Sequence, residues 1–374
     1  MQSIKSGFCF IVILFSVNIL YAQNEISISI ENSSPVETTK SFYSAADSQI
    51  QYVGRIQKTN PALPRFWMPG VYLKAKFEGK ILSFFLNDEV LYGNVHNYVE
   101  IIVDNKLFRL QTKYATNKFI VSGLKKGTHT ITICKDTESG NGYLEFAGIV
   151  CKKLLPLPPK PELKMEFIGN SITCGFGADA SQIICGKGQW YDQHNAYMSY
   201  GPLTARALNA QWQISAVSGI GMIHSCCDMK ILMPRVFDKI NMSGDSLSWN
   251  FDGYIPELVT ICLGQNDGIQ DSTAFCHAYV DFVKTIRSKY ADAKIILLTS
   301  PMANAKLRAV LKNYLSSIIV YFNNNGDKNI DKYVFEKSYN SGCLGHPDLK
   351  EQQEISDLLL QFITENNLIN SKED

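Results

Sequence analysis

The chain has 374 residues, of which 45% are hydrophobic and 19% are charged, and its formal net charge at pH 7 is +1. This length and hydrophobic content exclude a largely disordered chain and favour two domains with substantial cores. The balanced charge, without a dense Lys/Arg cluster in the sequence, argues against a nucleic-acid partner, because phosphate binding needs a basic surface.

Residues 1–22 have the organisation of a signal peptide. Lys5 precedes an apolar stretch over residues 8–20, and Ala22 ends the segment. We therefore expect cleavage after Ala22 and export to the periplasm or out of the cell. The segment holds one lysine and no acidic residue, so the mature chain has a formal net charge of zero, which suits a neutral partner such as a polysaccharide. No later stretch approaches about 20 unbroken apolar residues, so we expect no transmembrane span in the mature chain.

Residues 23–153 are predicted to form an all-β sandwich, similar to a jelly roll. Short runs rich in β-branched and aromatic residues alternate with Gly, Asn and Asp. The clearest runs are residues 70–77, 98–104, 118–121 and 129–134. Residues 104–106, Asp-Asn-Lys, mark a hairpin turn. Regularly spaced short strands of this kind are typical of sandwiches.

A proline-rich stretch, residues 154–163, is predicted to be an extended linker, because proline disfavours helix and favours polyproline geometry. From residue 164 to 370 predicted strands alternate with helices, which indicates a three-layer α/β/α domain with a parallel sheet. The predicted helices are residues 196–209, 271–290 and 304–323, and a last one with Ile355, Leu358, Leu359 and Phe362 on one stripe.

Four polar positions stand where the second domain would gather a site. Ser171, Gly219 and Asn266 each follow an apolar run that predicts a strand, and His346 stands just ahead of the last helix. The carboxyl ends of parallel strands converge on one crevice, so these residues can meet although they are far apart in the sequence. Taken singly, each has a structural explanation as a helix cap, a turn glycine or a loop histidine. Their order as a set favours catalysis.

The chemistry of these residue types is that of acyl transfer. A serine hydroxyl becomes a nucleophile when a base accepts its proton, and His346 is able to do so at neutral pH. The Ser171 and Gly219 N–H groups and the Asn266 amide would form an oxyanion hole, in which loss of one donor costs roughly 3 to 4 kcal/mol. The residues alone therefore predict a serine esterase that needs no cofactor and no metal.

The cysteines and one serine offer other interpretations, which we weigh here. Nine cysteines follow residue 22, an odd number whose pairing the sequence does not give, in a compartment where disulfides persist. Cys226 and Cys227, with flanking His224 and Asp228, resemble a metal site, but we favour a turn there. Residues 244–247 spell Gly-Asp-Ser-Leu, yet no apolar strand precedes them, so we predict a loop.

The four blocks resemble those of the SGNH hydrolases, also called the GDSL family. The resemblance implies that Ser171 is the nucleophile, that Gly219 and Asn266 complete the oxyanion hole, and that His346 is the general base. Many members carry Asp three residues before the histidine, where this chain has Cys343. Either a backbone carbonyl orients His346 or a carboxylate such as Asp348 does. We favour a Ser–His dyad with a carbonyl.

The order of sandwich, proline-rich link and SGNH domain resembles carbohydrate esterase family 2 over nearly the whole mature chain. Further matching stretches are residues 53–55, 67–71, 127–131, 166–175, 200–206 and 342–347. This family can lack the acidic triad member, in agreement with Cys343. The resemblance implies removal of O-acetyl groups from plant cell-wall polysaccharides or oligosaccharides such as xylan or mannan, through an acetyl-enzyme intermediate and without a cofactor.

Three alternatives stay open. Trp190 and Tyr191, between the Ser171 and Gly219 blocks, could stack on sugar rings, although ordinary packing is the interpretation that we favour. The enzyme could instead be an SGNH lipase or a deacetylase of another acetylated substrate. The chain could also be a glycan-binding protein whose SGNH half is inactive, but four intact site residues speak against this.

Overall fold

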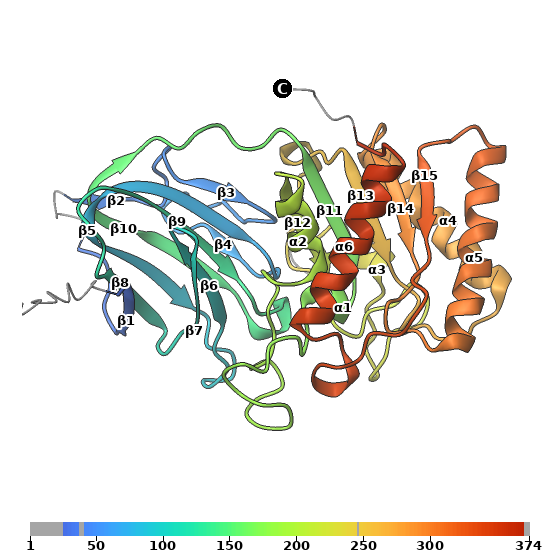
Figure 1. Ribbon diagram of the computed structural model, residues 1–374, viewed down its shortest axis with the longest axis horizontal. Coiled ribbons are helices and arrows are strands. Elements are labelled where there is room, and N and C mark those ends of the chain that lie inside the picture. Colours follow the sequence, from blue (N-terminus) through green and yellow to red (C-terminus); the bar gives the residue numbers. More distant parts are fainter. Residues whose placement is uncertain (1–24, 37–40, 245–246, 370–374) are drawn as a thin grey trace, which may run out of the picture.

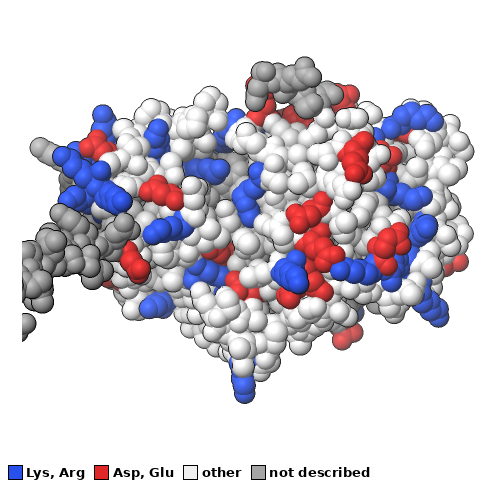
Figure 2. Space-filling model, viewed as in Figure 1, with Lys and Arg blue, Asp and Glu red and all other residues white. Residues whose placement is uncertain are grey.

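The computed structural model describes residues 25–36, 41–244 and 247–369. The predicted signal peptide, residues 1–22, lies outside the described residues, as do Asp245 and Ser246 of the Gly-Asp-Ser-Leu stretch. An antiparallel β domain and an α/β domain lie side by side along the long axis of the molecule (Figure 1). On the face that Figure 2 shows, basic and acidic side chains are mixed over both domains.

The first domain consists of antiparallel strands and one short 3-10 helix. Its elements are β1 (Ser27–Glu31), β2 (Phe42–Tyr43), β3 (Gln51–Val53), β4 (Arg65–Phe66), β5 (Tyr72–Asp88), β6 (Tyr98–Val103), β7 (Lys106–Gln111), β8 (Thr116–Ser122), β9 (Thr128–Lys135), η1 (Ser139–Asn141) and β10 (Leu144–Leu155). The long strand β5 pairs with β9 in its first part and with β8 in its second, while β10 runs beside both parts. The predicted all-β domain is confirmed, and β5 joins its strands into one curved sheet (Figure 1).

The core and one turn of this domain follow directly from the sequence pattern. Every second residue of β8 is buried, residues 82–86 of β5 are all buried, and the rings of Phe84 and Phe119 stack at 4.7 Å between centroids. Between β6 and β7, Asp104 and Asn105 have φ of 47° and 71°. Two successive positive φ values are what a two-residue hairpin turn requires, which confirms the predicted turn.

The second domain is a parallel five-stranded sheet between two layers of helices. Its elements are β11 (Lys164–Gly169), α1 (Ser171–Cys174), α2 (Tyr200–Ala207), β12 (Gln211–Ala216), α3 (Met233–Val236), η2 (Phe251–Gly253), β13 (Leu258–Cys262), α4 (Ser272–Lys289), β14 (Lys294–Leu298), α5 (Ala305–Asn324), β15 (Ile330–Tyr333), η3 (Cys343–Gly345) and α6 (Leu349–Glu365). The strand order is β12-β11-β13-β14-β15. Leu258 and Ile296 share a core with α2 and α6, whereas Val259 and Ile295 share one with α4 and α5. The predicted α/β/α arrangement is confirmed.

One helix is shorter than predicted. The pattern predicts a helix over residues 196–209, but α2 begins at Tyr200. The backbone N–H groups of Ala196 and Tyr197 instead donate to the carbonyl and the carboxylate of Asp136 in the first domain. A contact between domains thus replaces the first turn of the helix.

The two domains share a buried interface, so the proline-rich segment between β10 and β11 is not their sole connection. The rings of Tyr72 and Trp212 stack at 3.9 Å between centroids. Arg55 enters the second domain, where its Nη2 lies 3.1 Å from a carboxylate oxygen of Glu166 on β11, and neither side chain is exposed. The first domain therefore supports the strand that leads to Ser171.

Candidate active site

Ser171 stands at the carboxyl end of β11, between the neighbouring strands β12 and β13. It is the first residue of the one-turn helix α1, and the side chain of Asn170 caps this helix by accepting a hydrogen bond from Ile172 N. A Cβ atom at Gly169 would come within 2.0 Å of Thr173 Oγ1, so only glycine allows the chain to turn this sharply after the strand. The Ser171 N–H is one of the first helical N–H groups, which lack intrahelical acceptors.

His346 lies next to Ser171, although 175 residues separate them in the sequence. The distance from His346 Nε2 to Ser171 Oγ is 2.8 Å, and His346 Nδ1 lies 3.2 Å from the carbonyl oxygen of Leu344. A carbonyl only accepts, so Nδ1 carries the proton and Nε2 is left to accept from the serine hydroxyl. Burial lowers the pKa of His346 below its ordinary value of 6.5, which favours the neutral, basic ring.

Asp348 and Cys343, the two residues near the position of the usual acidic residue, both have structural partners. Asp348 Oδ1 accepts a hydrogen bond from Glu351 N at 2.8 Å and caps α6, so this carboxylate has a helix-capping role. Cys343 is bonded to Cys185 in a disulfide, a pairing that the sequence analysis leaves open. The two cysteines lie 158 positions apart, so no local pattern pairs them.

Gly219 and Asn266 follow the two strands that flank β11. The sheet register pairs Gly169 with Ala216 on one side and with Cys262 on the other, so the loops after the three strands leave the sheet at one level. Gly219 has φ of 81°, and among the described residues its N–H has no hydrogen-bond acceptor. One amide hydrogen of Asn266 is donated to Ile220 O at 2.8 Å, which leaves the second for a ligand. Donors from three loops thus lie at the same end of the sheet.

The sequence analysis missed two buried carboxylates that contact the loop after β12, which contains Gly219. Asp267 accepts hydrogen bonds from the backbone N–H groups of residues 222–224, at distances between 2.7 and 3.0 Å. Glu138, from the first domain, accepts one from Ser218 N at 2.8 Å. Asp267 adjoins Asn266 in the sequence and could have been suspected, whereas no local pattern links Glu138 to a site in the other domain.

Aromatic rings adjoin the histidine. The Phe176 ring lies 4.4 Å from that of His346 and 6.2 Å, stacked, from that of Trp190, measured between centroids. Trp190 is 46% exposed, whereas Tyr191 is 2% exposed. Trp190 therefore offers an open face near the candidate site, and Tyr191 belongs to the core.

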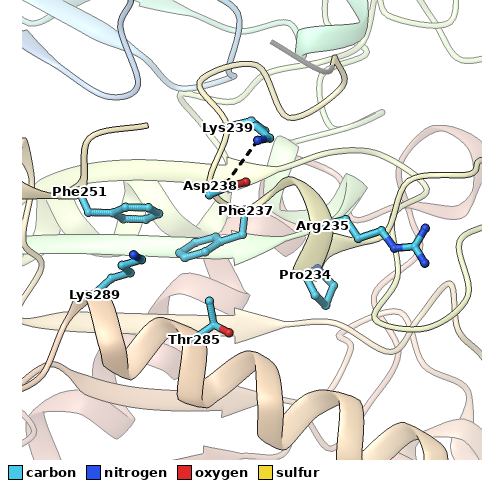
Figure 3. A pocket seen from close by; sticks show the side chains of 8 residues that line it. All are labelled: Pro234, Arg235, Phe237, Asp238, Lys239, Phe251, Thr285 and Lys289. Atoms are coloured by element: carbon cyan, nitrogen blue, oxygen red, sulfur yellow. Dashed lines mark hydrogen bonds and ion pairs between the residues drawn. The ribbon is translucent and has the colours of Figure 1, made fainter. Parts of the chain in front are cut away.

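One hollow of the molecule lies apart from the candidate site. A hollow of about 350 Å³ is lined by eight residues around α3 and α4, among them Phe237, Phe251 and Lys289 (Figure 3), and none of the eight belongs to the candidate site.

Over residues 25–36, 41–244 and 247–369, no group of three or more His, Cys, Asp or Glu side chains is arranged to hold a metal ion. Within the same residues, no helix has the length and apolar content to cross a membrane.

Two family comparisons match consecutive parts of the chain. The family described as Carbohydrate esterase 2 N-terminal matches residues 52–161, and the GDSL-like Lipase/Acylhydrolase family matches residues 167–325. The boundary between the two matches falls next to the end of the proline-rich segment. Both halves of the predicted resemblance are therefore found.

Individual relatives agree with these matches. The chain is 32% identical over 327 residues to Cellulase/esterase CelE of Acetivibrio thermocellus, covering 83% of this chain and 38% of that protein's length. It is 27% identical over 317 residues to an acetylxylan esterase / glucomannan deacetylase of Cellvibrio japonicus, covering 79% and 84% of the two chains. A family two carbohydrate esterase from Clostridium thermocellum, solved in complex with cellohexaose, superposes with a TM-score of 0.78 at 28% identity, covering 86% of this chain and 100% of that one.

Proposed function

The chain belongs to carbohydrate esterase family 2, and from this we propose that it is an exported serine esterase that removes O-acetyl groups from plant cell-wall polysaccharides or oligosaccharides. The observation that carries the proposal is the 2.8 Å separation between Ser171 Oγ and His346 Nε2, with the other ring nitrogen facing a carbonyl. The names of the Cellvibrio japonicus relatives support acetylated xylan or glucomannan as the substrate class.

The proposed reaction has two halves. Ser171 Oγ attacks the acetyl carbonyl while His346 Nε2 takes its proton, and the charged oxygen is received by the Ser171 and Gly219 N–H groups and the Asn266 amide. The tetrahedral adduct then breaks its bond to the sugar oxygen, which leaves as a hydroxyl with the proton from His346. Water, deprotonated by the same ring, then attacks the acetyl-enzyme, and the second adduct breaks its bond to Ser171 Oγ, which takes the proton back from His346 as acetate is released.

The Leu344 carbonyl takes over the function of the triad carboxylate, which is to orient the histidine ring. It fixes the ring orientation and the tautomer through the 3.2 Å contact with His346 Nδ1, and its dipole stabilises the imidazolium that forms. A carbonyl provides less charge stabilisation than a carboxylate does. Burial, which lowers the pKa of His346, keeps the ring in the form that accepts the proton.

Two alternatives are enzymes that act on another substrate, and the third is a glycan-binding protein without catalytic activity. Acetate release from acetylated xylan is compared with hydrolysis of long-chain nitrophenyl esters, and a preference for long chains would favour an SGNH lipase. A panel of other acetylated glycans tests for a deacetylase of another substrate. A glycan-binding protein without activity would leave Ser171 unlabelled by a fluorophosphonate.

The experiment that tests the proposal is acetate release by Ser171→Ala. Loss of the nucleophile is expected to lower the rate by more than about 10³-fold, with little loss of stability. Ser272→Ala is a matched control, because Ser272 is also the first residue of a helix but is exposed on α4. Equal rates for the two variants would refute the proposal.

A further inference from the structure

Glu138, in the segment after β9, belongs to the first domain and contacts a loop of the second. We call this loop, residues 217–220 around Gly219, the oxyanion loop. Glu138 accepts hydrogen bonds from both Ser218 N, at 2.8 Å, and Ser218 Oγ. The Glu138 side chain is buried, at 2% exposed, and Ser218 directly precedes Gly219. Burial raises the pKa of the Glu138 carboxyl, and the two Ser218 hydrogen bonds oppose this by favouring the acceptor form.

Buried contacts within the first domain hold the backbone of Glu138. Lys135, which is 1% exposed, donates through Nζ to the carbonyl oxygens of Thr137, at 2.7 Å, and Glu138, at 2.9 Å. Thr137 Oγ1 donates in turn to Asn97 Oδ1 at 2.6 Å. Because these partners belong to strands of the β domain or to loops beside them, the carboxylate is presented from a rigid support.

The geometry of the oxyanion loop explains why a contact to Ser218 matters. Ile220 N donates to Val217 O at 3.3 Å, which closes a four-residue turn with Ser218 and Gly219 at its centre. The φ of 81° at Gly219 is the value that a type II turn needs at its third position. Type I and type II turns differ by a flip of the central peptide, which here carries the Gly219 N–H, so the flipped turn would direct this donor to the opposite side.

The loop is held by two buried carboxylates, one from each domain. Glu138 fixes Ser218, and Asp267 fixes residues 222–224, so Gly219 lies between two anchored points. We propose that Glu138 is a positioning residue through which the β domain completes the oxyanion hole, holding the Ser218–Gly219 peptide in the orientation that directs the Gly219 N–H at the acyl oxygen. This inference rests on the proposed esterase function, and it assigns the first domain a part in catalysis besides any binding of glycan.

The test compares two substitutions at one position. Glu138→Ala removes both acceptors, whereas Glu138→Gln keeps one acceptor for Ser218 N and places an amide donor against Ser218 Oγ. We expect Glu138→Ala to lower kcat by roughly 10- to 100-fold with KM within about 3-fold, since misplaced groups cost up to about 10²-fold. Glu138→Gln should restore kcat to within about 5-fold of the parent. Glu145→Ala is the control, because this carboxylate pairs with Arg65 on the β domain and does not contact the loop.

Rates are divided by the number of Ser171 sites that a fluorophosphonate labels, so that misfolded protein does not count as slow enzyme. An unchanged kcat for Glu138→Ala, or a glutamine variant as slow as the alanine variant, would overturn the inference. If Glu138→Ala does not fold, Ser218→Ala replaces it, with an expected loss of about 3- to 10-fold in kcat, since one of the two contacts remains. An unchanged kcat would then overturn the inference.

The labelling rate separates this inference from the proposed function. Phosphonylation of Ser171 uses the same oxyanion hole but needs no acetylated glycan. If the parent protein is labelled and releases no acetate, the proposed substrate class is wrong, and the labelling rates still decide on Glu138. Slower labelling of Glu138→Ala than of Glu145→Ala supports the positioning role, and equal labelling contradicts it.

Discussion

Removal of the Cys185–Cys343 disulfide should reduce both stability and activity. The bond ties the turn before His346 to a loop 158 positions earlier in the chain. In the chain-entropy description, a cross-link closing a loop of this length stabilises the folded state by up to about 5 kcal/mol, and about 2 to 4 kcal/mol is typical. The double substitution Cys185→Ser with Cys343→Ser should therefore lower the free energy of unfolding by about 2 to 4 kcal/mol.

The expected loss of activity is smaller than that from removing His346, because other contacts keep the turn in place. Gly342 N donates to His346 O at 2.7 Å, and Cys343 N donates to Gly177 O at 2.9 Å. Both contacts use backbone atoms and survive the substitution. We therefore expect kcat to fall by about 10-fold, since the ring stays near Ser171 but is held less firmly.

Urea unfolding measures the first effect and acetyl-ester hydrolysis the second. Cys227→Ser is the matched control, because Cys227 is an exposed free cysteine, and it should leave both quantities unchanged. A double variant that kept the parent's unfolding free energy and kcat would contradict a structural role for this disulfide.

Three further predictions concern His346, its neighbour Asp348 and the domain interface. Since the neutral ring is the base and burial lowers its pKa, kcat/KM should be retained above that pKa and fall as the pH drops through it, with a midpoint below 6.5; a midpoint above 6.5 would contradict this. Asp348→Ala should lose about 1 kcal/mol of unfolding free energy with kcat within about 3-fold, whereas a loss as large as that of His346→Ala would mean that a carboxylate is needed. Arg55→Ala, which leaves Glu166 buried without its charged partner, should lower the unfolding free energy by about 3 to 5 kcal/mol in urea titrations, and a change under about 1 kcal/mol would count against a structural ion pair.

Much of the fold could be predicted because its signals are local. Alternating apolar residues mark the β strands, and the stripe of the last helix appears in α6, where Ile355 and Leu359 are fully buried. The order of the four polar blocks along the chain predicts the family, and the family matches over residues 52–161 and 167–325 confirm it. The catalytic roles of Ser171 and His346 stay predictions that the 2.8 Å contact supports.

The features that could not be predicted all depend on contacts between distant segments. Cys343 has its partner 158 positions away, and the sequence alone does not choose among the remaining cysteines. Glu138 belongs to the other domain and lies 80 positions from Ser218. The sequence pattern predicts a helix from residue 196, but α2 begins at Tyr200, and the N–H groups of Ala196 and Tyr197 donate to Asp136 of the other domain.

Reaction with a fluorophosphonate, followed by peptide mapping and measurement of acetate release, tests the central claim most directly. We expect one labelled site, Ser171, and a loss of acetate release in proportion to the fraction labelled. Label on another residue, or full acetate release by fully labelled protein, would contradict it.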